Sequence, residues 1–153
     1  MIEKTIKYLI ENNISIATAE SCTGGLIAKT ITDFSGVSQI YAEGYVTYSN
    51  EAKIKNLDVK RETLETYGAV SENTAREMAD GVRKKSGAVV GVSSTGIAGP
   101  GGGTPSKPVG LVYIACSTDK GCTVRELRLS GNRDEVRNKT VSEVFTLISD
   151  SIK

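Results

Sequence analysis

The spacing of apolar residues divides the chain into helices that alternate with strands. Helix-type spacing predicts helices, and short β-branched or apolar runs predict strands. The predicted helices cover residues 2–12, 24–34, 50–57, 60–67 and 71–85, and a last helix runs from Asn132 or Asp134 to the end. The predicted strands cover residues 14–19, 39–47, 88–94, 109–118 and 122–130. This alternation predicts an α/β fold, a three-layer α/β/α sandwich with a mixed, mostly parallel sheet of about five strands.

Three features of the predicted strands refine the sheet. Residues 88–94 form a continuous apolar run between helices, which is typical of a central strand covered on both faces. Residues 119–121, Asp-Lys-Gly, form a hairpin turn, so the last two strands pair antiparallel. Gly44 interrupts the second strand and indicates a bulge.

Size, charge and cysteine content limit the classes of protein. A chain of 153 residues suits one domain, which we expect over residues 1–153. Nineteen basic and eighteen acidic residues give no charge excess for nucleic acid, and no apolar run is long enough for a bilayer. Three scattered cysteines argue against a disulfide framework and favour the reducing cytoplasm. We expect a small-molecule partner and leave a homo-oligomer open.

The chain contains no histidine, and this restricts its chemistry. Ser-His-Asp and Cys-His mechanisms are excluded. The cysteines lack CxxC spacing, so we expect no zinc site, no other metal and no cofactor. A general base must then be Lys, Asp, Glu, Tyr or a water molecule.

Small polar residues follow three of the predicted strands, in residues 20–25, 47–50 and 93–96. If these strands are parallel, their carboxyl ends share one edge of the sheet, where α/β proteins bind ligands. The glycine-rich loop of residues 96–108 would then fold over that edge.

Ser21 and Lys53 are the candidate nucleophile and base. Ser21 lies at a strand-to-helix turn, where a helix starting near Thr23 would point free N–H groups at a developing oxyanion. Lys53 lies near a helix N-terminus, an unfavourable place for a cation, and a desolvated lysine has a lowered pKa. Cys22 is the competing nucleophile, because a thiol at a helix N-terminus has a lowered pKa, and Thr95 is a third.

Simpler interpretations of the same residues stay open. Ser21 or Thr23 is equally suited to cap a helix, and Lys53 to lie on a solvated face. Glu20 either orients Lys53 or caps a helix.

The glycine-rich loop matches neither common nucleotide-binding motif. It lacks the GK[ST] of a Walker loop and the GxGxxG order of a dinucleotide site. Its N–H groups could line a small polar ligand. Arg133 and Arg137, one helical turn apart, either hold a phosphate or pair with Asp134 or Glu135.

Six segments together resemble the CinA C-terminal domain family, the competence/damage-inducible proteins, over roughly residues 5–148. The segments are residues 18–25 (TAESCTGG), 44–53 (GYVTYSNEAK), 68–71 (GAVS), 96–102 (GIAGPGG), 107–110 (KPVG) and 131–133 (GNR). The resemblance implies a three-layer α/β/α domain and hydrolysis of nicotinamide mononucleotide to nicotinate mononucleotide and ammonia, a step in pyridine nucleotide recycling. We expect no N-terminal molybdopterin-binding-like domain of the kind that many members carry.

The resemblance assigns candidate roles to residues. Ser21 and Lys53 would be catalytic. The residues for oxyanion or substrate binding would be Cys22, Thr23, Gly24, Tyr48, Asn50, Thr95 and Gly96, and Tyr48 would lie along the pyridinium ring. The residues for phosphate binding would be Gly99, Gly101, Gly102, Arg133 and Arg137.

The mechanism stays open: either an acyl-enzyme forms on Ser21, or Ser21 and Lys53 activate a water molecule. Two other functions also stay open. The chain could be an amidase that uses Cys22, or a non-catalytic nucleotide-binding or competence-related regulatory module.

Overall fold

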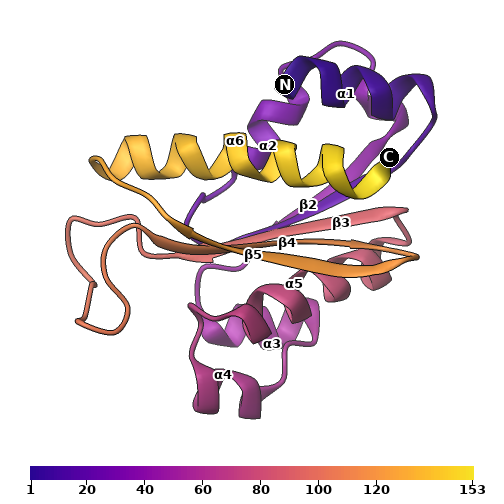
Figure 1. The fold of residues 1–153 in the computed structure, drawn as a ribbon. Helices are drawn as coiled ribbons and strands as arrows, with labels where there is room; N and C mark the ends of the chain where they lie inside the picture. Colours follow the sequence, from indigo (N-terminus) through magenta and orange to yellow (C-terminus); the bar gives the residue numbers. More distant parts are fainter.

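Five strands form one mixed sheet in the order β2-β1-β3-β4-β5 in the computed structural model, which describes residues 1–153 (Figure 1). The strands are β1 (Ile16–Glu20), β2 (Tyr41–Val46), β3 (Val90–Gly96), β4 (Leu111–Thr118) and β5 (Gly121–Arg128). β1 pairs parallel with β2 and β3, whereas the β3–β4 and β4–β5 pairs are antiparallel. Only β4 therefore runs against the other strands, and the predicted mixed sheet is confirmed.

Helices lie on both sides of the sheet (Figure 1). One face carries α1 (Ile2–Glu11), α2 (Leu26–Thr32) and α6 (Arg133–Ile152). The other face carries α3 (Asn50–Leu57), α4 (Arg61–Tyr67) and α5 (Glu72–Ser86). The three-layer sandwich is confirmed, with each helix within two residues of its predicted bounds. The short 3₁₀ helix Val37–Gln39 was not predicted.

Each face of the sheet has its own hydrophobic core. Ile6, Ile27 and Phe145 belong to the larger core, which lies under α1, α2 and α6. Leu57, Leu64 and Met78 belong to the smaller core, under α3, α4 and α5. No helix in the structure is both long and apolar enough to span a membrane.

The predicted bulge lies in β2, one residue before Gly44. Between its pairings with Ile16 and Thr18, β2 advances three residues, from Tyr41 to Gly44, where β1 advances two. A Cβ on Gly44 would collide with the hydroxyl oxygens of Thr18 and Tyr41, which are hydrogen-bonded to each other at 2.8 Å. The bulge and the glycine together let β2 reach the edge where its last residues meet those of β1.

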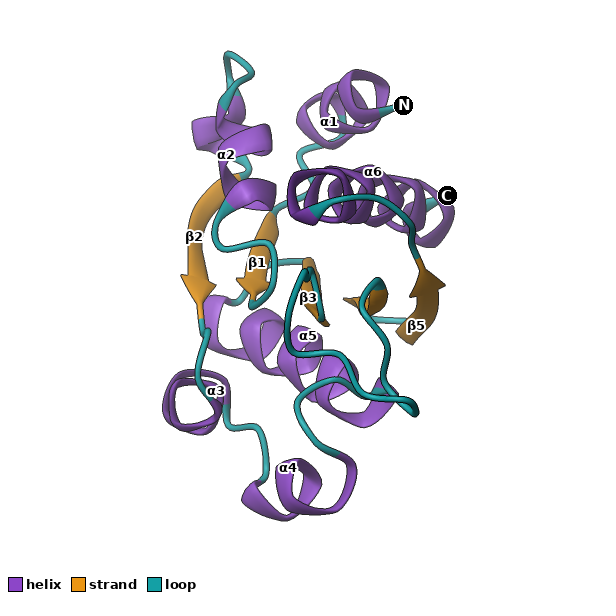
Figure 2. Ribbon diagram, turned by 90° about the vertical axis from the view of Figure 1, so that its left-hand side faces the viewer, coloured by secondary structure: helices purple, strands orange, loops and turns teal.

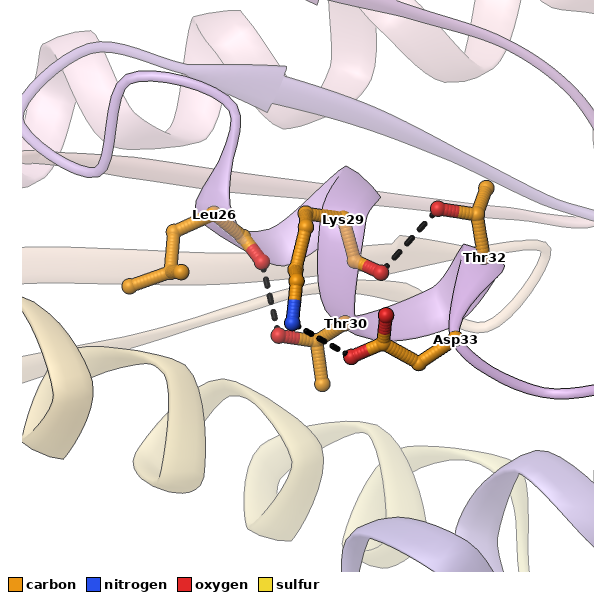
Figure 3. A network of polar contacts seen from close by, with 5 residues as sticks. All are labelled: Leu26, Lys29, Thr30, Thr32 and Asp33. Carbon is orange, nitrogen blue, oxygen red and sulfur yellow. Dashed lines mark hydrogen bonds and ion pairs between the residues drawn. The ribbon is translucent and has the colours of Figure 1, made fainter.

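Helix α2 begins at Leu26, two residues later than predicted, because Gly24 and Gly25 have φ values of +58° and +103°. A left-handed backbone does not continue a right-handed helix. Figure 3 shows the polar contacts along α2, where Lys29 pairs with Asp33 at 2.8 Å and Thr30 donates to the carbonyl of Leu26. The two glycines thus separate Ser21 from the helix by a full turn of irregular chain.

Candidate active site

The carboxyl ends of β1, β2 and β3 lie at one edge of the sheet, as the sequence predicts for parallel strands. Figure 2 is viewed toward this edge, and the glycine-rich loop between β3 and β4 crosses in front of it. The turn of residues 21–25 follows β1, residues 47–49 follow β2, and β3 ends at Gly96. This edge is where the predicted site residues gather.

Ser21 and Lys53 meet at this edge although 32 positions separate them in the chain. Lys53 Nζ lies 3.1 Å from Ser21 Oγ, and it donates to the carbonyl oxygens of Thr47 at 2.8 Å and Tyr48 at 3.3 Å. Carbonyl oxygens only accept hydrogen bonds, whereas a hydroxyl also donates. A neutral Lys53 amine would therefore keep its two N–H bonds on the carbonyls and accept the proton of Ser21.

Burial supports the neutral form of Lys53. The side chain is 1% exposed, and desolvation lowers its pKa from 10.5 to about 8. No carboxylate forms an ion pair with it, and both of its other partners are uncharged. About a tenth of the amine is therefore unprotonated at pH 7 and about half at pH 8, and this neutral form is the one that a general base requires.

The start of α3 positions Lys53. Ser49 caps the helix, because its side chain accepts from the N–H of Ala52 at 3.1 Å. The carbonyl of Ser49 accepts from the N–H of Lys53. Lys53 thus leaves the first turn of α3 and folds back over the chain that precedes the cap. The alternative of a solvated Lys53 is wrong.

Glu20 caps α2 and does not orient Lys53. Its carboxylate accepts from Thr23 Oγ1 at 2.6 Å and from the N–H groups of Ile27 at 2.8 Å and Ala28 at 3.0 Å. Thr23 Oγ1 also lies 2.7 Å from Ser94 Oγ on β3. A buried carboxylate at a helix N-terminus is stabilised by these donors and by the helix dipole. Glu20 therefore fixes the turn that carries Ser21.

Two adjacent N–H groups in this turn have no acceptor in another residue. Gly24 N donates to the carbonyl of Ser21 at 3.1 Å, and Ser21 N donates to the carbonyl of Ser94 at 3.0 Å. Neither Cys22 N nor Thr23 N donates to the backbone of another residue, and the Cys22 N–H approaches only its own thiol. Free N–H groups directly after a nucleophile are the usual donors of an oxyanion hole.

Cys22 does not have the lowered pKa that its place in the sequence predicts. Its side chain is 6% exposed, and desolvation raises the pKa of the thiol to about 11. The prediction was wrong because two glycines displace the helix N-terminus to Leu26 and the thiol points into the larger core. The thiol is therefore protonated at neutral pH and is a poor nucleophile.

Tyr48 and Arg133 lie at the rim of the site. The Tyr48 side chain is 63% exposed, and its hydroxyl accepts from Arg133 Nη2 at 3.3 Å. Arg133 Nη1 donates to the carbonyl of Gly99 at 2.8 Å. Asn50 is the exposed first residue of α3. Arg133 thus joins the start of α6, the β2–α3 connection and the glycine-rich loop.

The glycine-rich loop presents free N–H groups beside Arg133. The N–H groups of Gly99, Gly101 and Gly102 have no acceptor within the chain. Lys107, which sequence reasoning did not single out, donates to the carbonyl of Tyr67 at 2.6 Å and so ties the loop to the end of α4. The loop is therefore anchored on both sides of the site.

Thr95 and Gly96 lie on β3 and not in the loop. Thr95 Oγ1 donates its hydroxyl proton to the carbonyl of Ala69 at 2.8 Å. Gly96 pairs with Val112, and a Cβ there would lie 2.7 Å from the carbonyl oxygen of Leu111. The expectation that Gly96 starts the loop is corrected, because the β3–β4 ladder continues through it.

Arg137 lies behind the turn. Its Nη2 donates to the carbonyl of Thr23 at 2.9 Å and lies 3.1 Å from the place of a Cβ on Gly24. Its Nε is buried and has no acceptor. The two arginines that the sequence groups together therefore have different surroundings, with Arg133 at the rim and Arg137 against the backbone of residues 21–25.

Cavity size does not identify the site. A hollow of about 540 Å³, whose lining includes Ile2, Phe34 and Thr146, contains neither Ser21 nor Lys53. It contains no lysine beside its hydroxyl groups. The paired chemistry of Ser21 and Lys53 identifies the candidate site instead.

The family comparison covers almost the whole chain. The family model described as CinA C-terminal domain matches residues 1–152. A putative competence-damage inducible protein of Acetivibrio thermocellus is 60% identical over 142 residues, which is 93% of this chain and 34% of that protein. One of Clostridium botulinum is 52% identical over 99% of this chain and 37% of that protein. The chain thus spans about a third of the length of these relatives.

Solved structures share the fold. A competence/damage inducible protein from Agrobacterium tumefaciens has a TM-score of 0.90 at 42% identity, over 99% of this chain and 91% of that chain. A CinA superfamily protein from Klebsiella pneumoniae has a TM-score of 0.94 at 31% identity, over 98% of this chain and 94% of that chain.

Proposed function

Because this chain belongs to the CinA C-terminal domain family, we propose that it is an amidohydrolase that converts nicotinamide mononucleotide to nicotinate mononucleotide and ammonia. The observation that carries the proposal is the 3.1 Å contact between Lys53 Nζ and Ser21 Oγ. Hydrolysis of a carboxamide needs a nucleophile, a base, an oxyanion site and a proton for the departing ammonia. Groups suited to each of these needs lie within the turn of residues 21–25 and the start of α3.

The first half of the reaction uses Ser21 and Lys53. The neutral amine of Lys53 takes the proton of Ser21 while Ser21 Oγ bonds to the carboxamide carbon. The carbonyl oxygen becomes an oxyanion, and the free N–H groups of Cys22 and Thr23 donate to it. The Lys53 ammonium then gives its proton to the amide nitrogen, the C–N bond breaks, and ammonia leaves.

The second half of the reaction consumes water. Lys53, neutral again, takes a proton from a water molecule that attacks the ester carbon. The tetrahedral intermediate collapses, Ser21 recovers its proton from Lys53, and the carboxylate product leaves. A direct attack by water, with Ser21 and Lys53 as the activating pair, gives the same products without the ester. Mass spectrometry of acid-quenched enzyme distinguishes the two routes, since only the first leaves a nicotinoyl nucleotide on the peptide containing Ser21.

The rim suits the rest of the substrate. The exposed ring of Tyr48 offers a face for the positively charged pyridinium. The phosphate would accept from the N–H groups of Gly99, Gly101 and Gly102 and from the guanidinium of Arg133. Replacing the contact of Arg133 with Gly99 by a contact with phosphate needs only a change of rotamer, because the side chain is exposed.

Arg133→Gln should raise KM for nicotinamide mononucleotide about tenfold at unchanged kcat, because a hydrogen bond to a charged group contributes about 1.5–3 kcal/mol. The same variant should leave KM for the riboside, which lacks the phosphate, unaltered. Steady-state ammonia release with both substrates measures this. An equal rise in KM for both would place Arg133 outside the phosphate contact.

Cys22→Ala should keep most of the activity, since the Cys22 thiol is protonated and buried. Incubation with iodoacetamide should likewise leave the rate of ammonia release unaffected. Inactivation by the reagent that the Cys22→Ala variant escapes would restore the alternative of a cysteine amidase.

Ammonia release from a small panel of pyridine nucleotides tests the activity itself. We expect turnover of nicotinamide mononucleotide that survives EDTA, because the proposed chemistry uses no metal. The names of the curated relatives favour one second candidate, a competence-related regulatory module that binds a nucleotide. That candidate is supported by nucleotide binding without ammonia release, which would end the amidohydrolase proposal.

A further inference from the structure

Two peptide groups connect the guanidinium of Arg137 to the proposed oxyanion site. Arg137 Nη2 donates to the carbonyl of Thr23 at 2.9 Å. The N–H of the same peptide group belongs to Gly24, and it donates to the carbonyl of Ser21 at 3.1 Å. The N–H of that next peptide group belongs to Cys22, and it donates to no other residue. A continuous hydrogen-bonded chain therefore runs from a fixed positive charge to a free donor beside Ser21.

A chain of hydrogen bonds of this kind strengthens the N–H donor at its end. Each hydrogen bond polarises the peptide group that accepts it, so that the N–H of that group becomes a better donor, by about 10–30% per bond. A charged donor at the start has the largest effect, because charge-assisted hydrogen bonds are about twice as strong as neutral ones. The Cys22 N–H is thus a stronger donor than an isolated peptide N–H.

The surroundings of Arg137 keep its charge available for this purpose. Arg137 takes part in none of the ion pairs of the structure, so no carboxylate neutralises it. Its side chain is half-buried, and Nε is shielded from solvent without an acceptor. Gly24 leaves the space in which Nη2 approaches the turn. The charge is therefore held against the backbone by packing.

We propose that Arg137 is a positioning residue, which aligns and polarises the Cys22 N–H for the oxyanion through the Thr23 and Ser21 peptide groups. This inference rests on the proposed amidohydrolase function. It gives Arg137 a role different from the phosphate contact predicted from the sequence, which Arg133 serves from the rim.

Three arginine variants test the inference by kinetics. Arg137→Gln should lower kcat about tenfold with KM for nicotinamide mononucleotide unchanged, a smaller loss than the 10²–10³-fold for removing an oxyanion donor outright. Arg137→Lys, which keeps a cation within reach of Thr23, should recover most of that loss. Arg125→Gln, which removes a half-buried arginine paired with Asp150 in the last turn of α6, should match the parent. A rise in KM at constant kcat for Arg137→Gln would overturn the inference and restore the phosphate contact.

An NMR readout separates this inference from the proposed function. Protein labelled with ¹⁵N-cysteine gives amide signals for Cys22, Cys116 and Cys122 only, and Cys22→Ala identifies the first. Arg137→Gln should move the Cys22 amide proton upfield, while Arg137→Lys and Arg125→Gln leave it in place. This holds whether or not the chain releases ammonia. An unmoved Cys22 signal in Arg137→Gln would overturn the polarisation, even if the parent protein is active.

Discussion

Ser21→Ala should lower the rate of ammonia release from nicotinamide mononucleotide at least about a thousandfold, because it removes the hydroxyl proposed to attack the carboxamide carbon. The hydroxyl contacts Lys53 at 3.1 Å, and the two free N–H groups follow it in the chain. Alanine keeps the backbone of the turn, since the carbonyl and N–H of residue 21 make the same hydrogen bonds. The measurement is a coupled ammonia assay at saturating substrate.

Ser106→Ala is the matched control for Ser21→Ala. It removes an exposed hydroxyl from the glycine-rich loop, whose one contact is a long 3.5 Å approach to Thr104, and should leave the rate unchanged. A Ser21→Ala variant that retains a tenth or more of the parent rate would remove Ser21 as the nucleophile. In that case an activated water remains the only compatible route through Lys53.

Lys53→Met should lower kcat about 10²–10⁴-fold, the usual contribution of a positioned general acid–base group. Methionine fills the buried space of the lysine stem but neither takes nor returns a proton. Lys53→Arg should be equally impaired, because a guanidinium stays charged at any pH that the protein tolerates. Full activity in either variant would exclude Lys53 as the base.

The stability of Lys53→Met provides a check that is independent of activity. Between pH 8 and 10.5 the folded protein holds Lys53 neutral, whereas the unfolded chain holds it charged and so binds more protons. The free energy of unfolding of the parent therefore rises with pH across this window, by at most about 3 kcal/mol from this residue. Subtracting the pH curve of Lys53→Met should isolate this rise. A flat difference curve would show that Lys53 is not desolvated in solution.

The sequence predicts the layers of the fold well, because each element carries its own local signal. Apolar spacing locates the helices, and the continuous run of residues 88–94 locates the central strand β3. The ends of elements are less well predicted. α2 starts late because of two positive φ values, and β3 extends through Gly96 because it pairs with β4. These outcomes depend on tertiary pairing, which no local pattern contains.

The candidate site was likewise predicted in part. The order of strands and small polar residues predicts that Ser21 and Lys53 share one edge, and the structure places them in contact. Their catalytic roles stay predictions. The sequence predicts a lowered pKa for Cys22, whereas the structure raises it. The hydrogen-bond partners of Glu20 and Arg137 could not be chosen from the sequence. Each of these depends on the path of the backbone through residues 21–25, and the two carbonyls that hold Lys53 have no side-chain signature.

Activation of Ser21 by a neutral Lys53 amine should make kcat/KM depend on pH. Ammonia release should be measured from pH 6 to 10 at subsaturating nicotinamide mononucleotide. Burial lowers the pKa of Lys53 to about 8, so kcat/KM should rise about tenfold per pH unit well below that value and level off above it. A rate that is constant or falls as the pH rises through 8 would contradict the account.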